Sequence, residues 1–379
     1  MTSKSEPERR YFATAARGTE GVLRDELREL AIPAVKATRG GVHFGGDFTS
    51  AMRACLHSRI AVRVLEKLAQ FPAVDAKQLY QGARLVKWER FLGPSTTLAV
   101  RANLRDSTLT HSTFVSLKVK DAIVDSLRDR LRVRPNVDRY EPDVLITVHL
   151  IKNQAELFVD LSGNPLHRRG YRIAAGSAPL KETLAAAILR FSGWRADKSL
   201  IDPMCGSGTF VIEAAMQAQN VAPGLNRKRF GFERWICHDQ ERKRQIAELR
   251  KQAREIQKTD GRTSFILGRD RDAATLAIAR ANAKRAGVNA RWEVGEVRDL
   301  KPNCEPGWLV TNPPYGVRLS SDASLPSQMA RRFRELSGFR VCALLSDREL
   351  PKAMRLRPTI EHELWNGKIE CRLFCWDIP

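Results

Sequence analysis

Hydrophobic and polar positions follow two different patterns along the chain, and the change falls near residue 180. Before it, stretches with a period of two, as at 98–104, alternate with stretches of helical period, as at 112–131. Short strands and helices in this mixture are typical of small α+β modules. We therefore expect a first module over residues 1–60 and a second over residues 61–165.

The region after residue 165 begins with a basic linker, 166–180, which contains proline and glycine. From 181 to 379, helices alternate with short apolar strands, which we expect at 199–202, 265–267, 308–311 and 341–345. This order predicts an α/β fold with a doubly wound, Rossmann-like, mostly parallel sheet. The dipeptide Asn366-Gly367 suits a type I′ turn and predicts an antiparallel hairpin at the end of the chain.

An excess of positive charge narrows the class of partner. The 379 residues hold 64 Lys+Arg and 43 Asp+Glu, a net charge of +21. Such a balance favours a polyanion such as a nucleic acid, although a solvated basic surface is the alternative. The candidate contacts to its phosphates and bases lie on the helix at 112–131, in the linker and directly after it: Lys118, Lys120, His167, Arg168, Arg169, Tyr171 and Lys181.

Composition also excludes several classes of protein. A hydrophobic content of 43% is ordinary for a globular chain, and no apolar run reaches the roughly 18 residues of a membrane-spanning helix. The seven cysteines form no C-x-x-C pair, which argues against a zinc ribbon or a disulfide framework and for the reducing cytoplasm. The histidines form no ligand cluster with Cys or Asp, so we expect no metal.

A glycine turn follows the expected strand at 199–202 and consists of Asp202, Pro203, Met204, Cys205, Gly206, Ser207, Gly208 and Thr209. Its two glycines allow a ligand to approach the backbone. Val211 occupies the third glycine position of the dinucleotide fingerprint, and no Gly-Lys-Ser/Thr follows, so a pyrophosphate ligand is not expected. The acid before the glycines suits a cationic amino group, and a tight structural turn is the alternative.

A second acid is expected at the end of the next strand, where it would bind a ribose. Asp270, followed by Arg271, takes this place, although Asp239 is a competing candidate at more usual spacing. Preferring Asp270 makes residues 223–261 a basic insertion. Glu296, followed by Val297, comes after a further strand and is the candidate for an adenine edge.

The tetrapeptide Asn312-Pro313-Pro314-Tyr315 is the most informative turn in the chain, because it follows an expected strand of the same sheet. The two prolines stiffen the backbone. The Asn312 side chain and the Pro313 carbonyl offer two acceptors, and Tyr315 offers a stacking face. These two acceptors and the stacking face are what a site needs to bind an exocyclic amine on a planar base. The alternative interpretation is a structural turn whose tyrosine lies in the core.

Together, these two turns resemble those of class I S-adenosylmethionine-dependent methyltransferases that modify exocyclic amines. The resemblance extends to segments 11–18, 40–44, 118–123, 134–138, 160–163, 166–172 and 179–185, which are similar to the N-terminal part of bacterial 23S rRNA guanine-N2 methyltransferases of the large-subunit L type. That family has a ferredoxin-like domain, a THUMP RNA-binding domain and a Rossmann-like catalytic domain.

The resemblance implies S-adenosylmethionine as cofactor, with its methionine part at Asp202 to Thr209, its ribose at Asp270 and its adenine near Glu296. It implies a flipped guanine at Asn312, Pro313 and Tyr315, and 23S rRNA or a precursor of the large ribosomal subunit as partner. Some members carry a second methyltransferase that makes 7-methylguanosine. Since this sequence ends at Pro379, we expect that activity to be absent.

Three alternatives stay open at this point. A tRNA guanine-N2 methyltransferase would use the same chemistry on another RNA. A DNA adenine-N6 methyltransferase would use the same Asn-Pro-Pro-Tyr turn, but the RNA-binding resemblance argues against it. A catalytically silent RNA chaperone or assembly factor would not need both turns intact.

Cys205 is expected to line the glycine turn, with no role as a nucleophile.

Overall fold

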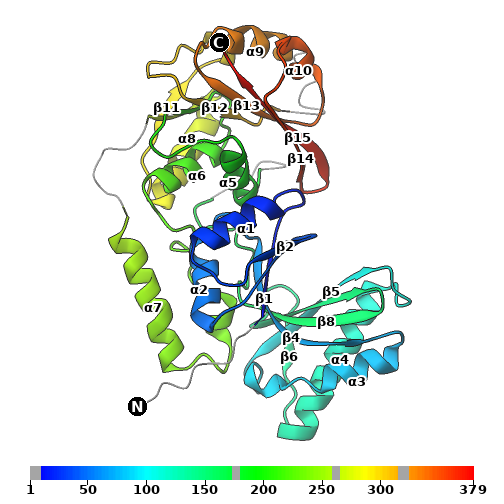
Figure 1. The fold of residues 1–379 in the computed structure, drawn as a ribbon. Helices are drawn as coiled ribbons and strands as arrows, with labels where there is room; N and C mark the ends of the chain where they lie inside the picture. Colours follow the sequence, from blue (N-terminus) through cyan, green and yellow to red (C-terminus); the bar gives the residue numbers. More distant parts are fainter. Residues whose placement is uncertain (1–9, 173–179, 258–264, 315–323) are drawn as a thin grey trace.

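The computed structural model describes residues 10–172, 180–257, 265–314 and 324–379 and contains two β-sheets (Figure 1). The N-terminal sheet has eight strands in the order β2-β3-β1-β4-β8-β7-β5-β6. Its strands are β1 (Tyr11–Thr14), β2 (Lys36–Thr38), β3 (Gly41–Phe44), β4 (Arg63–Pro72), β5 (Thr97–Arg105), β6 (Asn136–Val137), β7 (Val144–Ile151) and β8 (Gln154–Asp160).

The strand β4 joins the two expected modules into one sheet. It pairs with β1 on one side and with β8 on the other, in both cases antiparallel. It runs from Arg63 to Pro72, directly after the expected boundary at residue 60. Because β4 pairs with strands of both modules, residues 10–165 form one continuous body.

Four helices cover a single face of this sheet: α1 (Glu20–Glu29), α2 (Phe48–His57), α3 (Ala76–Arg84) and α4 (Ser112–Leu131). Their apolar residues share one core with the strands. Asp47 caps α2, since its carboxylate accepts the Ser50 N–H at 2.7 Å. Leu131, at the end of α4, is 46% exposed and lies outside this core.

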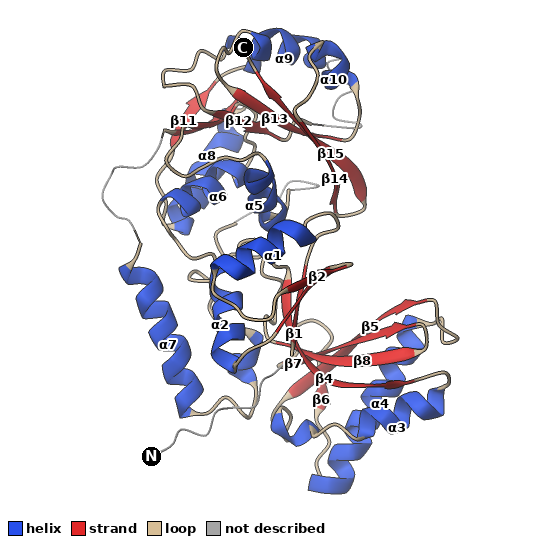
Figure 2. Ribbon diagram, in the orientation of Figure 1, coloured by secondary structure: helices blue, strands red, loops and turns tan. Residues whose placement is uncertain are grey.

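The C-terminal sheet has seven strands in the order β11-β10-β9-β12-β13-β15-β14. They are β9 (Leu200–Asp202), β10 (Ile266–Asp270), β11 (Arg291–Val294), β12 (Trp308–Thr311), β13 (Arg340–Leu345), β14 (Ile360–Asn366) and β15 (Ile369–Asp377). The first five are parallel to their neighbours, and β15 runs antiparallel to β13 and β14. The expected doubly wound sheet with a terminal hairpin is therefore present (Figure 2).

Helices pack on both faces of this sheet, as the alternating sequence pattern requires. One face is covered by α5 (Glu182–Phe191), α6 (Thr209–Ala218) and α8 (Ala273–Ala286). The other is covered by α9 (Leu325–Arg334) and α10 (Glu349–Met354). Within the described residues, none of the helices has the length and apolar content to cross a bilayer.

The terminal hairpin turns in a different way from the prediction. Asn366 pairs with Ile369, so the two residues of the turn are Gly367 and Lys368. Only Gly367 of these has a positive φ, +68°. A glycine in the first turn position is typical of a type II′ turn. The predicted type I′ turn at Asn366-Gly367 is therefore wrong in type, and the turn lies one residue further along the chain.

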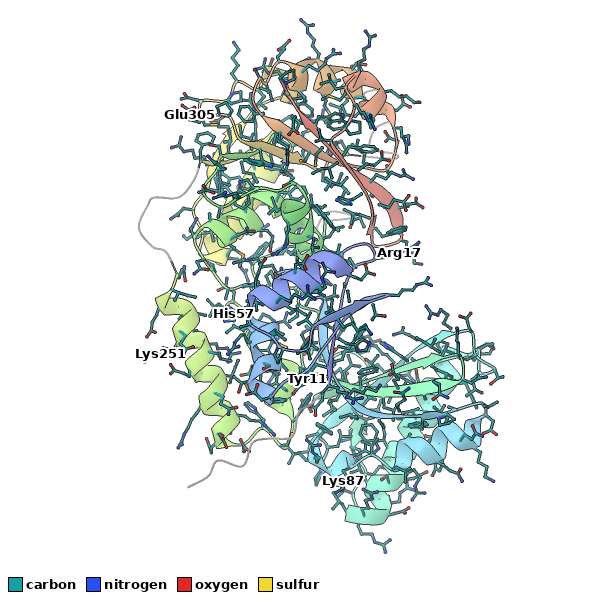
Figure 3. All side chains as sticks on the ribbon, viewed as in Figure 1. Tyr11, Arg17, His57, Lys87, Lys251 and Glu305 are labelled. Atoms are coloured by element: carbon teal, nitrogen blue, oxygen red, sulfur yellow. The ribbon has the colours of Figure 1, made fainter. Side chains whose placement is uncertain are left out.

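The expected insertion at 223–261 returns to the N-terminal module. Its helix α7 (Gln240–Glu255) packs against α2 and adds Ile246, Leu249 and Ala253 to the N-terminal core. The ring centroids of Phe48 in α2 and Phe232 in the insertion lie 5.5 Å apart. Lys251 points away from the body of the molecule (Figure 3) and its side chain is 67% exposed. One side of the insertion thus holds the two halves together, and its basic side faces solvent.

Candidate active site

The two turns singled out in the sequence leave the C-terminal sheet at the same edge. The strands β9 and β12 are parallel neighbours, with Ile201 opposite Leu309. The chain adds β10 and β11 on one side of β9 and then crosses over to place β12 on its other side. The strand order therefore reverses at β9 and β12, which is the usual ligand site of such sheets. The glycine turn after β9 and the Asn-Pro-Pro turn after β12 therefore lie side by side, as predicted.

Hydrogen bonds and glycine backbone angles fix the shape of the glycine turn. The Gly206 N–H donates to the Asp270 carboxylate at 2.8 Å, and the Gly208 N–H donates to the Cys205 carbonyl at 2.8 Å. Both glycines have positive φ, +55° and +85°. A Cβ on Gly208 would lie 2.9 Å from the Trp292 ring, whereas a Cβ on Gly206 would meet nothing within 4 Å. Gly208 is therefore required by packing, and Gly206 borders open space.

Arg172 ties the linker to this turn, and the sequence analysis did not include it among the site residues. Its guanidinium donates to the hydroxyls of Ser207 and Thr209, each at 3.0 Å, and forms an ion pair with Glu182 at 2.8 Å. The run of basic residues around Tyr171 contained the signal, but nothing in the sequence distinguished one arginine from the next.

Asp202 lies under the turn as a nearly isolated carboxyl group. It is 2% exposed and accepts the Met204 N–H at 3.2 Å. Burial raises the pKa of Asp202 to about 7, and the nearby Asp270 acts in the same direction. A positively charged ligand group at this place would favour the ionised form and compensate for the burial.

Cys205 is not an activated nucleophile. Burial raises the pKa of this thiol well above its usual range, and the neighbouring Asp202 and Asp270 raise it further. A thiol in such a place stays protonated at neutral pH. The prediction that Cys205 has no nucleophilic role therefore fits its surroundings.

The expected nucleoside contacts lie on the far side of the glycine turn. Asp270 ends β10 and also accepts the Asp272 N–H at 3.0 Å, so its carboxylate organises two loops. Glu296 follows β11 and is half-buried; Val297 is 3% exposed, and Arg271 is exposed. The competing acid, Asp239, caps α7 by accepting the Arg242 N–H at 3.0 Å, and so belongs to the insertion.

Asn312 presents a buried acceptor with no partner. Its Oδ1 atom is shielded from solvent and receives no hydrogen bond from the described residues. Buried polar atoms are almost always paired, so an exception calls for an explanation. Pro313 is buried and, with Pro314, borders a small hollow of about 20 Å³ whose other walls include Leu325, Met329 and Asp347. Tyr315, the fourth residue of the predicted set, lies outside the described residues.

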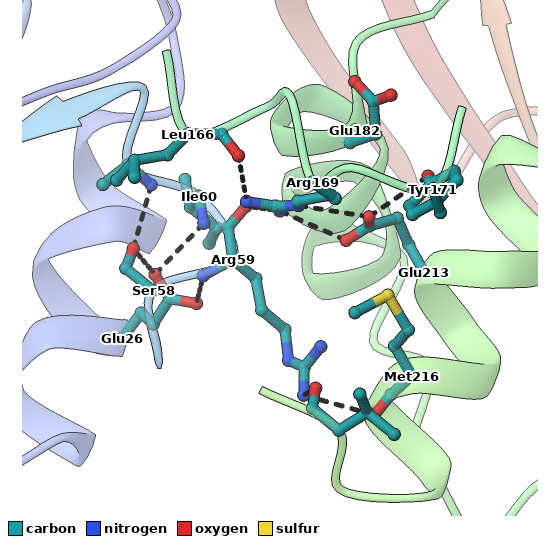
Figure 4. A network of polar contacts seen from close by, with 12 residues as sticks. Glu26, Ser58, Arg59, Ile60, Leu166, Arg169, Tyr171, Glu182, Glu213 and Met216 are labelled. Atoms are coloured by element: carbon teal, nitrogen blue, oxygen red, sulfur yellow. Dashed lines mark hydrogen bonds and ion pairs between the residues drawn. The ribbon is translucent and has the colours of Figure 1, made fainter. Parts of the chain in front are cut away.

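Two of the predicted RNA contacts are wrong. Arg169 and Tyr171 are 2% and 1% exposed, so their side chains are not available to a nucleic acid. Arg169 forms a buried ion pair with Glu213 of α6 at 3.2 Å and donates to the carbonyls of Leu166 and Arg59 (Figure 4). This group of side chains, here called the interdomain joint, binds the linker and the N-terminal module to the catalytic domain.

The other predicted RNA contacts remain accessible. Arg168 and Lys181 are exposed, and His167 is half-buried. Lys118 and Lys120 line a groove between α3, α4 and β6 together with Tyr80 and Arg134. The Lys118 Nζ atom lies 4.8 Å from the centre of the Tyr80 ring. Their role in RNA binding stays a prediction.

Comparison with known proteins gives matches over the whole described fold. Family models match an RlmL ferredoxin-like domain at residues 10–65, a THUMP domain at 73–160 and an RMKL-like methyltransferase domain at 169–374. A solved structure, that of SMU.472, "a putative methyltransferase complexed with SAH", superposes with a TM-score of 0.87 at 32% identity and covers 99% of both chains.

Two curated relatives agree. The ribosomal RNA large subunit methyltransferase K/L of Syntrophotalea carbinolica is 43% identical over 97% of this chain, but the chain spans about half of its length, 53%. A putative RNA methyltransferase of Synechocystis, slr0064, is 36% identical over 98% of this chain and 97% of its own length. The resemblance and the fold class predicted from the sequence are confirmed. The chain thus belongs to the RMKL-like methyltransferases whose catalytic domain follows an RlmL ferredoxin-like domain and a THUMP domain.

Proposed function

We propose that this chain transfers a methyl group from S-adenosylmethionine to the exocyclic N2 amine of a guanosine in 23S rRNA. The observation that carries the proposal is the unpaired, buried Oδ1 atom of Asn312 beside the glycine turn. The printed names of the relatives from Syntrophotalea carbinolica and Synechocystis support an RNA substrate, and the first supports ribosomal RNA.

The residues of the glycine turn suit this cofactor. The open space beside Gly206 admits a ligand against the backbone, and the buried Asp202 suits its amino group. Asp270 keeps lone pairs free for a ribose hydroxyl, since a carboxylate accepts about four hydrogen bonds and two are used here. When bound, S-adenosylmethionine supplies an electrophilic methyl group on a positively charged sulfur.

The Asn-Pro-Pro-Tyr turn positions the amine. In our proposal, Asn312 Oδ1 and the Pro313 carbonyl each accept one N–H of the guanine N2 group, and Tyr315 stacks on the base. Two acceptors orient the nitrogen and increase its electron density. Catalysis then rests on positioning and electrostatics, with no covalent intermediate on the protein. The guanine must leave its stack to reach the turn, which costs a few kcal/mol and less for an unpaired base.

The test compares Asn312→Ala with the wild-type protein, using radiolabelled S-adenosylmethionine and undermethylated 23S rRNA. We expect loss of transfer with unchanged cofactor binding by calorimetry. The matched control is Asn289→Ala, an exposed asparagine in the loop before β11. Unchanged methyl transfer by Asn312→Ala would remove the assigned role.

The same assay separates the related substrates. Parallel reactions with tRNA and with duplex DNA, at equal nucleotide concentration, should give little incorporation. Preferential methylation of tRNA would replace rRNA with tRNA in the proposal, and N6-methyladenine in DNA would overturn it. Absence of S-adenosylmethionine binding by the wild-type protein would favour a silent RNA-binding factor.

A further inference from the structure

The second face of the N-terminal sheet carries no helix among the described residues (Figure 2). Directly opposed residues on neighbouring strands point to the same face, and so do residues two apart on one strand. One row across the sheet runs Lys36–His43–Phe12–Leu65–Asp160, and the next runs Lys67–Phe158–Thr147–Arg101. We call the surface formed by these two rows, with Glu156, His149, Asn103 and Arg105, the open sheet face.

The centre of the open sheet face is apolar and aromatic. Phe12, Leu65 and Phe158 form a small cluster of their own, separate from the core under the helices. They are buried, at 6%, 1% and 1% exposure, so a ligand on this face meets the exposed side chains around them. The ring centroids of His43 and Phe12 lie 4.8 Å apart, and those of His149 and Phe158 lie 5.0 Å apart. His43 is exposed, so its outer face offers a flat ring to a ligand.

The charges around this centre are predominantly positive. The two carboxylates of the open sheet face are occupied, since Asp160 pairs with Arg63 and Glu156 pairs with Lys67. Lys36 and Arg101 are exposed, and neither has a carboxylate within 4.0 Å in the described part of the chain. Such cations can contact phosphate without first giving up an internal partner.

The open sheet face also leads toward the catalytic domain. Arg63, at its edge, donates to the Gly163 carbonyl at 2.9 Å, where the chain leaves the sheet. Exposed Arg168 and Lys181 continue the positive surface along the linker. The same linker then reaches the glycine turn through the hydrogen bond from Arg172 to Ser207.

We propose that the open sheet face binds the RNA strand that adjoins the target nucleotide, with phosphates on Lys36 and Arg101 and an unpaired base on His43. This inference rests on the proposed function. It follows from the chemistry of single-stranded RNA, which proteins hold by cations along the backbone and by flat rings under the bases. The groove at Lys118 and Lys120 lies on the helical side of the sheet and is the competing site.

The test measures binding of the full-length chain to a fluorescent transcript of 23S rRNA at several salt concentrations. For the double variant Lys36→Ala/Arg101→Ala, we expect about tenfold weaker binding at 0.1 M salt. The slope of log K against log salt should fall by about 1.4, since each phosphate contact on a single strand contributes about 0.7. His43→Ala should weaken binding about fivefold with an unchanged slope, because it removes stacking only.

The matched control is Arg195→Ala/Lys198→Ala, two exposed cations before β9, at the opposite end of the catalytic sheet. It should leave affinity and slope unchanged, and S-adenosylmethionine binding should be unchanged in every variant. A third pair, Lys118→Ala/Arg134→Ala, tests the groove. If that pair weakens binding while the open-face pair matches the control, the inference is overturned.

The outcome is independent of the proposed function. If the wild-type chain binds rRNA through the open sheet face but transfers no methyl group, the activity fails and the surface stands. If the wild-type chain methylates rRNA and the open-face variants keep its KM and affinity, the surface fails and the activity stands.

Discussion

The interdomain joint and the carboxyl edge of the catalytic sheet both bury polar side chains, but they differ in how these are paired. At the joint, all three guanidinium nitrogens of Arg169 donate hydrogen bonds, and Glu213 receives two of them. At the sheet edge, Asn312 Oδ1 has no partner and Asp202 accepts the Met204 N–H. The Arg169–Glu213 pair completes its own hydrogen bonds, although Nη1 of the neighbouring Arg59 has no partner among the described residues. The edge, by contrast, leaves acceptors for a ligand.

This difference has a physical reason. A buried charge without a partner costs several kcal/mol, so a structural ion pair must be complete within the folded chain. A binding site can leave polar groups unpaired because its ligand forms their hydrogen bonds, and the free protein is less stable as a result. Substitutions at the joint should therefore affect folding, and substitutions at the edge should affect binding and catalysis.

The largest expected effect is at the joint. Arg169→Ala leaves the Glu213 carboxylate buried without its cation, and we expect a loss of about 3–5 kcal/mol in the free energy of the first unfolding transition. Urea denaturation followed by tryptophan fluorescence measures this change. The control is Arg169→Met/Glu213→Leu, which removes both charges and should recover most of the loss. A destabilisation below 1 kcal/mol in the single variant would contradict the structural role.

The next effect is catalytic. Asn312→Ala should lower kcat about 100-fold, equivalent to about 2.7 kcal/mol, as expected when one preorganised polar contact to the reacting group is removed. Because Oδ1 has no hydrogen-bond partner among the residues that the structure describes, the free energy of unfolding should change by less than about 0.5 kcal/mol. A large loss of stability with unchanged kcat would move Asn312 into the same class as the joint.

The third effect is a pH dependence of cofactor binding. Burial raises the pKa of Asp202 to about 7 in the free protein, and a bound cation favours the ionised form. Affinity for S-adenosylmethionine should therefore be constant above pH 7 and fall up to tenfold for each pH unit below it. Calorimetry between pH 5.5 and 8 measures this, and Asp202→Asn should bind weakly with a flat profile. An equal slope in both proteins would refute the assignment.

The same group makes the opposite prediction for folding. The folded pKa of Asp202 lies above its ordinary value, so its contribution to stability is present at low pH and is lost as the pH rises through about 7. Protein without cofactor should thus gain from this residue on acidification, and the gain should be absent in Asp202→Asn.

The sequence predicted the catalytic half well because its evidence was local. The strand before Asp202, the glycines and the cap at Asp272 each follow from residues a few positions apart, and all are present. The sheet order then placed Asn312 next to Asp202 because parallel strands end at one edge. The same local reasoning misplaced the hairpin turn, since pairing of Asn366 with Ile369 depends on the register of two whole strands.

The joint could not be predicted because its partners are far apart in the chain. Arg168 and Arg169 are neighbours, yet one is exposed and the other meets a glutamate 44 positions away. Neither charge nor spacing distinguishes them. The return of α7 to the N-terminal core has the same cause, as its apolar residues match α2 only after both domains have folded.

The smallest expected effect separates two aspartates that the sequence left in competition. Asp239 accepts the Arg242 N–H and so caps α7, in the insertion that packs on the N-terminal core. Asp239→Ala should lower the free energy of unfolding by about 1 kcal/mol, a usual value for a lost helix cap, and should leave S-adenosylmethionine binding unchanged. Asp270→Ala should weaken that binding, because it removes both the ribose acceptor and the partner of the Gly206 N–H. Weaker cofactor binding in Asp239→Ala, with normal binding in Asp270→Ala, would return the ribose to Asp239 and place the ligand site outside the carboxyl edge.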